Sequence, residues 1–346
     1  MGSDLEKEEV ETWKALIPNR EDVETVYNMY KFEQYKPDPT ADPIFGQLTH
    51  NGIFQMRHRK IYMDEEQFIT PENYNNVDIL VRSTCRDRTL HSVQSLLSGF
   101  FPITEFKDTY PIIQIEPDGI CCLNREDPES QNNYNRRLGM YDWQEHEERM
   151  MRKYGDIVTT HIPFFRNQKH IRWPDVMDFV ITRYNHLMDI PEEVYTIFPE
   201  VYKHNMNKFR ILYNTPKCLH SFCDALLEMI KKEVDDVMSG AVQRKMSIYS
   251  GHDTTLMPLL NVLAPFLPVE VPKYGSQICL EYWENEFDQS IDVAMRFNGY
   301  YQPIFIEHYV ESLIVPYPEF CKTLTIPKYL LEVMRDKNKL AVLEDE

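Results

Sequence analysis

The sequence feature that most constrains the fold is an abrupt junction between a strand pattern and a helix pattern near residue 250. The stretch IYSGHDTTLMPLL begins at Ile248 as a β-branched and aromatic run, and an apolar run with helical spacing follows Thr255. His252 and Asp253 stand between the two patterns. Backbone N–H groups at a helix N-terminus favour anions, so this position suits binding or catalysis. The pair is either half of an active site or a well-capped turn, and the local sequence leaves both readings open.

Composition narrows the classes of partner. The chain has 346 residues, a hydrophobic content of 42% and a net charge of −18, so it can bury a sizeable core. Such an acidic chain is a poor candidate for nonspecific binding to nucleic acid or to anionic membranes. No apolar run approaches the roughly 18 residues that a membrane span requires. We therefore expect no nucleic-acid partner and no membrane span.

The cysteines and the first residues bear on compartment and cofactors. The 7 cysteines include no C-x-x-C pair and no Cys/His cluster with zinc spacing, so we expect no metal site and no cofactor. The opening MGSDLEKEEVETW is acidic and lacks the apolar core of a secretory signal. These features favour reduced thiols in an intracellular protein, mitochondrial or cytoplasmic and not secreted.

Strand and helix patterns at both ends of the chain predict an α/β core that carries a cap. Strand signals occur at 24–32, 78–83, 246–250, 278–286 and 290–297, and the last two read as an antiparallel pair at one sheet edge. Helix signals occur at 49–63, 91–100 and 221–238. We predict a core of residues 20–110 and 240–346, a mainly helical insertion at 111–239, and an acidic N-terminal extension at 1–19.

A second polar motif follows the predicted strand at 78–83. The segment VRSTCRDRTL, residues 81–90, carries three arginines, of which Arg82 projects from the carboxyl end of the strand. Open α/β sheets bind ligands at that edge. Arg86 and Arg88 are expected to pair with nearby carboxylates instead, with Asp87 as the local partner of Arg88. An arginine at a strand end is usually structural, so Arg82 alone does not identify a site.

Three segments in order are more specific than either motif alone. FGQLTHNG (45–52), VRSTCRDRTL (81–90) and YSGHDTTLMPLLNVL (249–263) together resemble the histidine acid phosphatase family, the branch-two histidine phosphatases, and particularly its lysophosphatidic acid phosphatases. The resemblance implies a three-layer αβα core with a mostly parallel sheet and a smaller, mainly helical cap. In that family a histidine attacks phosphorus, arginines and a second histidine hold the phosphoryl oxygens, and an aspartate protonates the leaving group. Arg82, His252 and Asp253 match the latter roles.

The chain departs from the family at the nucleophile. Aligning Pro37 with the proline of the R-H-G-x-R-x-P motif sets Phe32 against the attacking histidine, Glu33 against the glycine, Tyr35 against the second arginine and Lys31 against the first. Phenylalanine has no lone pair to attack phosphorus, and a carboxylate at 33 would repel a phosphate. The resemblance therefore predicts a remnant phosphate pocket of Arg82, His252, Asp253 and Lys31 without an intact catalytic set.

Three functions follow from this departure. The first is a pseudophosphatase that serves as a structural or binding subunit with other protein subunits, in a larger intracellular or mitochondrial assembly. In it, Arg82 would pair with Glu33, and Asp253 or Thr254 would cap the helix. The second is an active acid phosphatase that hydrolyses phosphomonoesters such as lysophosphatidate. The third is a phosphate or phospholipid sensor without turnover. His58, in the basic run MRHRK, lies in a predicted helix and reads as a solvated face instead of a substitute nucleophile.

Overall fold

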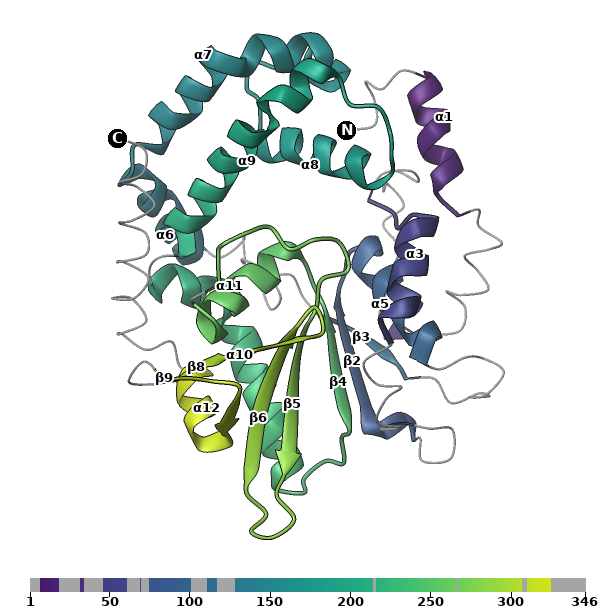
Figure 1. Ribbon diagram of the computed structural model, residues 1–346, viewed down its shortest axis with the longest axis vertical. Helices are drawn as coiled ribbons and strands as arrows, with labels where there is room; N and C mark the ends of the chain where they lie inside the picture. The colour runs from purple at the N-terminus through teal and green to yellow at the C-terminus, as the bar shows by residue number, and fades with distance from the viewer. Residues whose placement is uncertain are drawn as a thin grey trace.

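The computed structural model describes residues 7–18, 32–33, 46–60, 69, 75–100, 111–116, 128–213, 216–265, 267–306 and 310–324. Within them, a mixed α/β fold confirms the predicted fold class. The cap helices lie at one end of the molecule, and the hairpin between β5 and β6 projects at the opposite end (Figure 1). The strand predicted at 24–32 lies outside the described residues except for its last position.

A parallel sheet forms the part of the core that ends near His252. Its strands are β1 (Phe32–Glu33), β3 (Ile113–Glu116), β2 (Ile79–Thr84) and β4 (Met246–Ser250), in that spatial order. Each neighbouring pair runs parallel. Strand β2 is buried along almost its whole length, as expected of a strand covered on both faces. The predicted bounds of β4 are confirmed.

The antiparallel strands form sheets of their own. One contains β5 (Ile278–Glu284), β6 (Ile291–Phe297), β7 (Tyr300–Gln302) and β10 (Ile314–Pro316), and the other pairs β8 (Ile304–Ile306) with β9 (Val310–Ser312). The antiparallel pairing of β5 with β6 confirms the prediction from the alternating pattern. The described residues place this pair in a sheet separate from the parallel one, where a shared sheet edge was expected.

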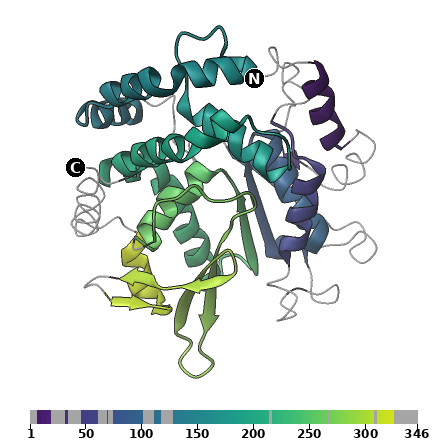
Figure 2. The same cartoon turned by 45° about the horizontal axis from the view of Figure 1, so that its top comes forward.

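The helices of the described residues divide between the core and the cap. In chain order they are α1 (Lys7–Leu16), α3 (His50–Arg57), α5 (Asp87–Phe100), α6 (Pro128–Gly139), α7 (Trp143–His161), α8 (Trp173–Asn185), α9 (Glu192–Tyr213), α10 (Pro216–Met238), α11 (Asp253–Leu263) and α12 (Tyr317–Leu324), with short 3₁₀ turns at His58–Lys60, Asn76–Asp78 and Pro163–Phe165. Helices α7, α8 and α9 build a layer across the end of the sheet (Figure 2). Their shared apolar cluster centres on the fully buried Trp173 and Phe165.

Two elements of the predicted insertion at 111–239 pack with the core. Strand β3 lies between β1 and β2, and its Ile113 joins the cluster that β2 forms with α5. Helix α10 contributes Leu226 and Leu227 to the cluster that it shares with α11 and α12. Because these contacts belong to the core, we propose a narrower cap of residues 128–213.

The N-terminal extension contains a helix that rests on the cap. Helix α1 contacts α8 through an ion pair of Glu9 with Arg183, and the rings of Trp13 and His186 meet edge to face with centroids 5.5 Å apart. Arg183 is itself buried, with 8% of its surface exposed. A buried guanidinium needs such a partner, because an unpaired charge would lose its hydration without compensation.

Helices α3 and α5 approach so closely that a glycine is required between them. A Cβ atom built on Gly99 would lie 2.2 Å from the carbonyl oxygen of Arg57. That oxygen belongs to the backbone of α3, which cannot move aside as a flexible side chain can. The contact therefore fixes the separation of the two helices at their carboxyl ends.

We predict that Gly99→Ala lowers the free energy of unfolding by about 1–3 kcal/mol, because the helices must separate or strain to admit the methyl group. Gly139→Ala is the matched control, since a Cβ there meets nothing within 4 Å. The control should change stability by less than about 1 kcal/mol. Urea unfolding monitored by circular dichroism measures both. Equal stability of the Gly99→Ala variant and the parent would contradict the close-contact argument.

Candidate functional site

The His252 side chain lies where the carboxyl ends of β2 and β4 meet. The two strands pair in register, with Ser83 opposite Ser250, so the residues that follow them emerge at the same edge of the sheet. His252 Nε2 lies 3.1 Å from Thr84 Oγ1, and His252 Nδ1 lies 3.3 Å from an Nη atom of Arg88. Ser250 also donates a 2.8 Å hydrogen bond to the carbonyl of Thr89, which ties β4 to α5.

The guanidinium of Arg88 indicates the direction of the two hydrogen bonds that the His252 ring makes. A guanidinium only donates, so Nδ1 of His252 accepts, and the neutral ring then carries its proton on Nε2 and donates to Thr84. Thr89 donates its hydroxyl proton to the Arg86 carbonyl, 2.8 Å away. Thr84 therefore donates to Thr89 across 2.7 Å. The result is a directed chain of hydrogen bonds from exposed Arg88 to the buried threonines, and it orients the imidazole.

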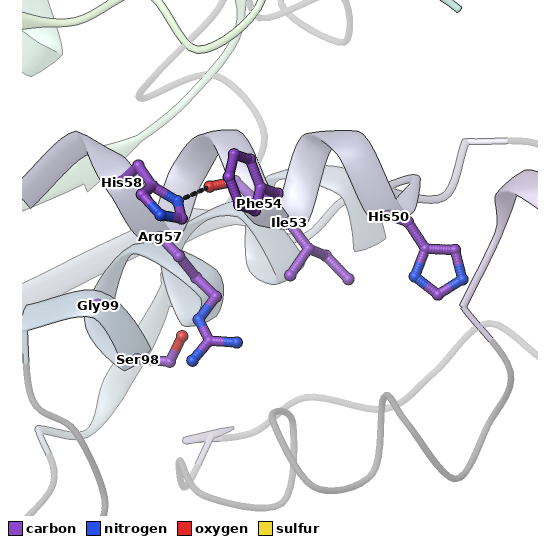
Figure 3. Close-up of a pocket in the computed structure, with 7 residues that line it drawn as sticks. All are labelled: His50, Ile53, Phe54, Arg57, His58, Ser98 and Gly99. Atoms are coloured by element: carbon purple, nitrogen blue, oxygen red, sulfur yellow. Dashed lines mark hydrogen bonds between the residues drawn. The ribbon is translucent and has the colours of Figure 1, made fainter.

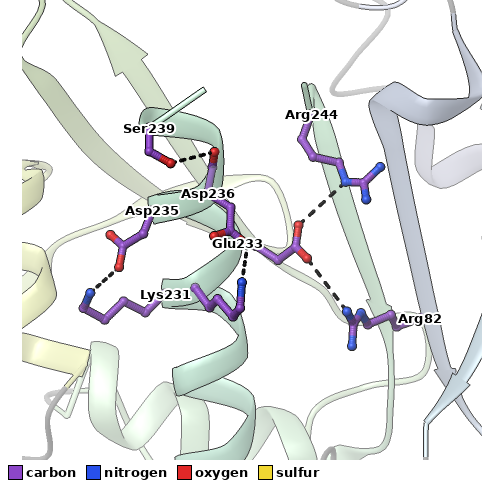
Figure 4. A network of polar contacts seen from close by, with 8 residues as sticks. Arg82, Lys231, Glu233, Asp235, Asp236, Ser239 and Arg244 are labelled. Atoms are coloured by element: carbon purple, nitrogen blue, oxygen red, sulfur yellow. Dashed lines mark hydrogen bonds and ion pairs between the residues drawn. The ribbon is translucent and has the colours of Figure 1, made fainter. Parts of the chain in front are cut away.

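Arg82 points to a different part of the molecule. Its guanidinium lies 3.0 Å from Met229 Sδ and 3.8 Å from Glu233, both on α10. Glu233 also lies 3.7 Å from Arg244, so one carboxylate connects β2 to the turn before β4 (Figure 4). Glu233, instead of the predicted Glu33, is the acidic neighbour of Arg82 that the structure describes, since the side chain of Glu33 lies outside the described set. Asp87 accepts a 2.9 Å hydrogen bond from Gln47, and its predicted local pair with Arg88 stays a prediction.

The turn into α11 also differs from prediction in its cap. The predicted caps, Asp253 and Thr254, are wrong because the helix begins at Asp253 and its N-cap residue is His252. Thr255 accepts a 3.0 Å hydrogen bond from the backbone N–H of His252. Gly251 makes this turn possible, since a Cβ there would lie 2.7 Å from Thr255 Oγ1. Asp253 is exposed beside the imidazole, and its carboxylate accepts from the Thr254 N–H at 2.8 Å.

The cap contributes an acidic residue, Asp178, that the sequence motifs do not indicate. Asp178 on α8 is accessible to solvent, yet crowding by protein and the negative charges of Asp253 and Asp175 raise its pKa to about 6. The positive charges of Arg88 and Arg172 act in the opposite direction on that pKa. These electrostatic couplings involve Asp253 and Arg88 of the core and Asp178 of the cap. No sequence motif marks Asp178, so only the tertiary arrangement could have identified it.

Tyr274 is a residue of the core that contacts helix α8. Its hydroxyl lies 3.2 Å from that of Thr182, one helical turn beyond Asp178 on α8. Burial, together with the charges of Asp178 and Asp253, raises the pKa of Tyr274, while the hydrogen bond from Thr182 and the charge of Arg88 oppose the rise. The loop that carries Tyr274 thus contacts α8 through Thr182 and α3 through a 3.2 Å hydrogen bond from Gln55 to the Tyr274 carbonyl. We use the name His252 recess for Arg88, His252, Asp253, Asp178 and Tyr274.

Strand β1 does not bring the predicted nucleophile position to His252. Phe32 and Glu33 pair with Ile113 and Gln114 at the sheet edge opposite β4. Two strands separate β1 from β4, which corresponds to roughly 14 Å at the spacing of neighbouring strands. Lys31 and Tyr35 lie outside the described residues. The backbone at Phe32 is therefore remote from the imidazole.

A separate pocket runs along α3 from His50 to His58 and meets α5 near its carboxyl end. It has a volume of about 550 Å³, and its lining includes basic side chains of the MRHRK run (Figure 3). His58 donates a 2.7 Å hydrogen bond from Nδ1 to the Phe54 carbonyl, and its ring contacts the Phe54 ring. Ser98 and Gly99 line the pocket from α5, about 16 Å along that helix from Arg88. The full lining is His50, Ile53, Phe54, Arg57, His58, Ser98 and Gly99.

Three general features complete the description. Over the described ranges, no group of three or more His, Cys, Asp or Glu side chains is placed to hold a metal ion. Among the helices described, none is both long enough and apolar enough to cross a bilayer. Cys85, Cys223, Cys279 and Cys321 are not joined in disulfides.

Comparison with protein families supports the sequence resemblance. The model of the histidine phosphatase superfamily (branch 2) matches residues 6–298. Counting factor 60 of Dictyostelium discoideum is 25% identical over 342 residues, covering 91% of this chain and 74% of that protein. Lysophosphatidic acid phosphatase type 6 of Mus musculus is 22% identical over 321 residues, covering 87% of this chain and 72% of that protein.

A further relative is matched over a smaller part of its length, and a solved structure shares the fold. The 2-phosphoxylose phosphatase 1 of Mus musculus is 24% identical over 284 residues, and the match spans 73% of this chain but only 55% of that protein. Among solved structures, the phytase from Citrobacter braakii superimposes with a TM-score of 0.56 at 14% identity, covering 83% of this chain and 90% of the phytase. At that identity the likeness concerns the fold alone.

We predict that Thr89→Val lowers the free energy of unfolding by about 1–3 kcal/mol, because it removes the buried hydroxyl in the middle of the directed hydrogen-bond chain. Thr196→Val is the control, since that exposed hydroxyl bonds only to a carbonyl of its own helix. The control should stay within about 0.5 kcal/mol of the parent. Thermal unfolding measures the difference. Equal losses of stability in the two variants would show that the buried hydrogen bonds of Thr89 contribute no more than an exposed hydroxyl does.

Proposed function

Because the chain belongs to branch 2 of the histidine phosphatase superfamily, we propose that its His252 recess binds the phosphoryl group of a phosphomonoester without turning it over. The observation that carries this proposal is the contact of Arg88 with His252 at the joint end of β2 and β4. The chain would then be a pseudophosphatase that uses a retained binding site within an assembly of protein subunits, in the mitochondrion or the cytoplasm.

The groups present suit an oxyanion. Arg88 offers a planar set of donors that matches two phosphoryl oxygens, and charge-assisted bonds of this kind are stronger than neutral ones. The start of α11 adds the positive end of the helix dipole, which favours an anion. Arg88 is exposed, so a ligand can reach it without displacing the core. Arg88 replaces Arg82 in our assignment, because Arg82 faces α10 and Glu233.

The absence of turnover rests on the chemistry of the first motif. Transfer through a phosphorylated histidine needs an imidazole lone pair aimed at phosphorus, and the alignment sets Phe32 at that position. The remote placement of β1 agrees with a site that lacks this group, since no part of Phe32–Glu33 pairs near β4. Loss of a covalent nucleophile removes many orders of magnitude from the rate.

One observation favours a second candidate, an active acid phosphatase. Asp253 is exposed directly beside His252, where a protonated carboxyl could deliver a proton to a leaving group. The names of the relatives include phosphatases of lysophosphatidic acid and of 2-phosphoxylose, so a sugar or lipid phosphomonoester is the substrate class for this alternative. It requires a nucleophile that the Lys31–Pro37 alignment does not supply.

We predict saturable binding of phenyl phosphate by calorimetry, weakened at least about tenfold in Arg88→Ala through loss of a bidentate donor. Arg82→Ala is the matched control, because it removes an arginine of the same motif that faces α10. Its affinity should stay within about twofold of the parent, although its stability falls with the loss of the Glu233 contact. Equal loss of affinity in both variants would mean that Arg82 also holds the phosphoryl group. Failure of the parent protein to bind phenyl phosphate would refute a phosphate site.

Hydrolysis separates the two candidates. We expect p-nitrophenyl phosphate at pH 4–7 to be hydrolysed no faster by the parent than by His252→Ala. Turnover by the parent that disappears in the variant would establish the active phosphatase. Size-exclusion chromatography of the native protein from cells tests the assembly, and elution near the monomer mass of 41.3 kDa would contradict a stable subunit role.

A further inference from the structure

The turn that joins β5 to β6 presents an aromatic ring to solvent. We call residues 284–290 the hairpin tip, which projects from the molecule at the end opposite the cap (Figure 1). Phe287 in this turn is 98% exposed. Glu284, Glu286 and Asp288 flank it in the sequence, and all three side chains are exposed. The hairpin tip is therefore an apolar ring among negative charges.

Hydrogen bonds within the turn hold the hairpin tip in one conformation. The backbone N–H of Phe287 donates to the Asn285 side chain across 2.9 Å, and that of Gln289 donates to the Asn285 carbonyl across 2.8 Å. The N–H of Ser290 donates to the Asp288 carboxylate at 3.0 Å, and hydrogen bonds from Ser290 lower the pKa of Asp288. A turn that is already ordered loses little conformational entropy when its ring is buried against a partner.

The pocket along α3 has the complementary character. Ile53 and Phe54 give it an apolar surface, and the Phe54 side chain is 65% exposed. Arg57 supplies the one permanent charge of the described lining, which includes no acidic side chain although the chain has 55 Asp and Glu residues. Arg57 and Ile53 extend from the same side of α3 (Figure 3). A volume of about 550 Å³ lies in the range of ligand pockets, so an aromatic ring can enter beside the guanidinium.

We propose that the hairpin tip of one copy of this chain docks in the pocket along α3 of a second copy, with Phe287 against Phe54 and the tip carboxylates beside Arg57. Contact between aromatic rings and charge-assisted bonds to a guanidinium both stabilise such an arrangement. The net charge of −18 repels copies over most of their surface, so a local basic pocket is the kind of place that can receive an acidic turn.

The proposed contact joins unlike surfaces. The tip belongs to β5 and β6 and the pocket to α3 and α5, so each copy can offer its tip to one neighbour and its pocket to another. A turn and one pocket bury less area than a standard interface, and contacts of that size are weak. This inference rests on the subunit role proposed above and supplies its partner, a second copy. It makes no use of the His252 recess.

Sedimentation equilibrium of the full chain tests the docking. The average mass of the parent should rise above 41.3 kDa across loading concentrations of about 10–300 µM. Phe287→Ser and Arg57→Glu should each weaken self-association at least about tenfold. Leu187→Ser and Arg149→Glu are the matched controls, since they remove an exposed apolar side chain and reverse an exposed arginine elsewhere. Both controls should associate as the parent does.

A mixture of the two docking variants tests the geometry. Phe287→Ser keeps its pocket and Arg57→Glu keeps its tip, so the mixture should form a dimer with one copy of each and no larger species. Failure of this dimer to form would overturn the inference, because the two surfaces would then not meet each other. Self-association of either variant at the strength of the parent would overturn it as well. Thermal unfolding confirms that folded proteins are being compared.

Two further measurements separate this inference from the proposed function. Both docking variants should bind phenyl phosphate as the parent does, because neither residue belongs to the His252 recess. A purified parent that stays monomeric at every concentration would overturn the docking. If the protein from cells still elutes above the monomer mass, the subunit role then belongs to another partner. Binding of phenyl phosphate by that monomer would leave the phosphoryl site standing.

Discussion

The parallel pairing of β2 with β4 is the interaction on which the described site depends. Residues Ile79–Ser83 pair with Met246–Ser250, although more than 160 positions of sequence separate the two strands. Because the strands are parallel and in register, the turns that leave them emerge side by side. Thr84 and His252 are brought into contact by that register alone. A shift by one residue would turn each side chain of one strand to the opposite face of the sheet and separate the pair.

The cap is attached to this end of the sheet through a few specific side-chain contacts. Helix α8 is attached to the core side through Thr182 with Tyr274 and through His186 with Thr49. It is held on its other side by the Arg183 contact with Glu9 of α1. A helix fixed on both sides can hold a carboxylate near an arginine that belongs to another layer. The electrostatic character of the recess is therefore a property of two layers jointly, with donors from the core and acidic groups from the cap.

Much of the fold was predictable because its elements carry strong local patterns. The β-branched run before Gly251 and the alternation of Ile291–Phe297 identify strands by period alone, and both are confirmed. Strand β3 was harder to place, since a four-residue strand in a short segment between prolines gives no indication of which layer it joins. The apolar stripe of α10 was evident, but only its packing on α11 and α12 shows that it belongs to the core.

The site was less predictable, for a physical reason. The arginine-rich motif identified the correct edge of the sheet, yet side chains of alternate strand residues face opposite layers, and Arg82 points to α10. Arg88 reaches His252 because it lies on the first turn of α5, where the helix begins beside the strand end. Asp178 has no local signature at all. Its electrostatic coupling to Arg88 and Asp253 joins segments that are distant in sequence, which periodicity and motif spacing do not encode.

The closeness of α3 and α5 connects two parts of the molecule. The two helices are joined at one end by the Gln47 bond to Asp87 and at the other by the backbone contact at Gly99. Helix α5 carries Arg88 on its first turn, and Ser98 and Gly99 near its carboxyl end line the basic pocket. One helix, held at both ends by its neighbour, thus contributes residues to the pocket and to the sheet edge at His252.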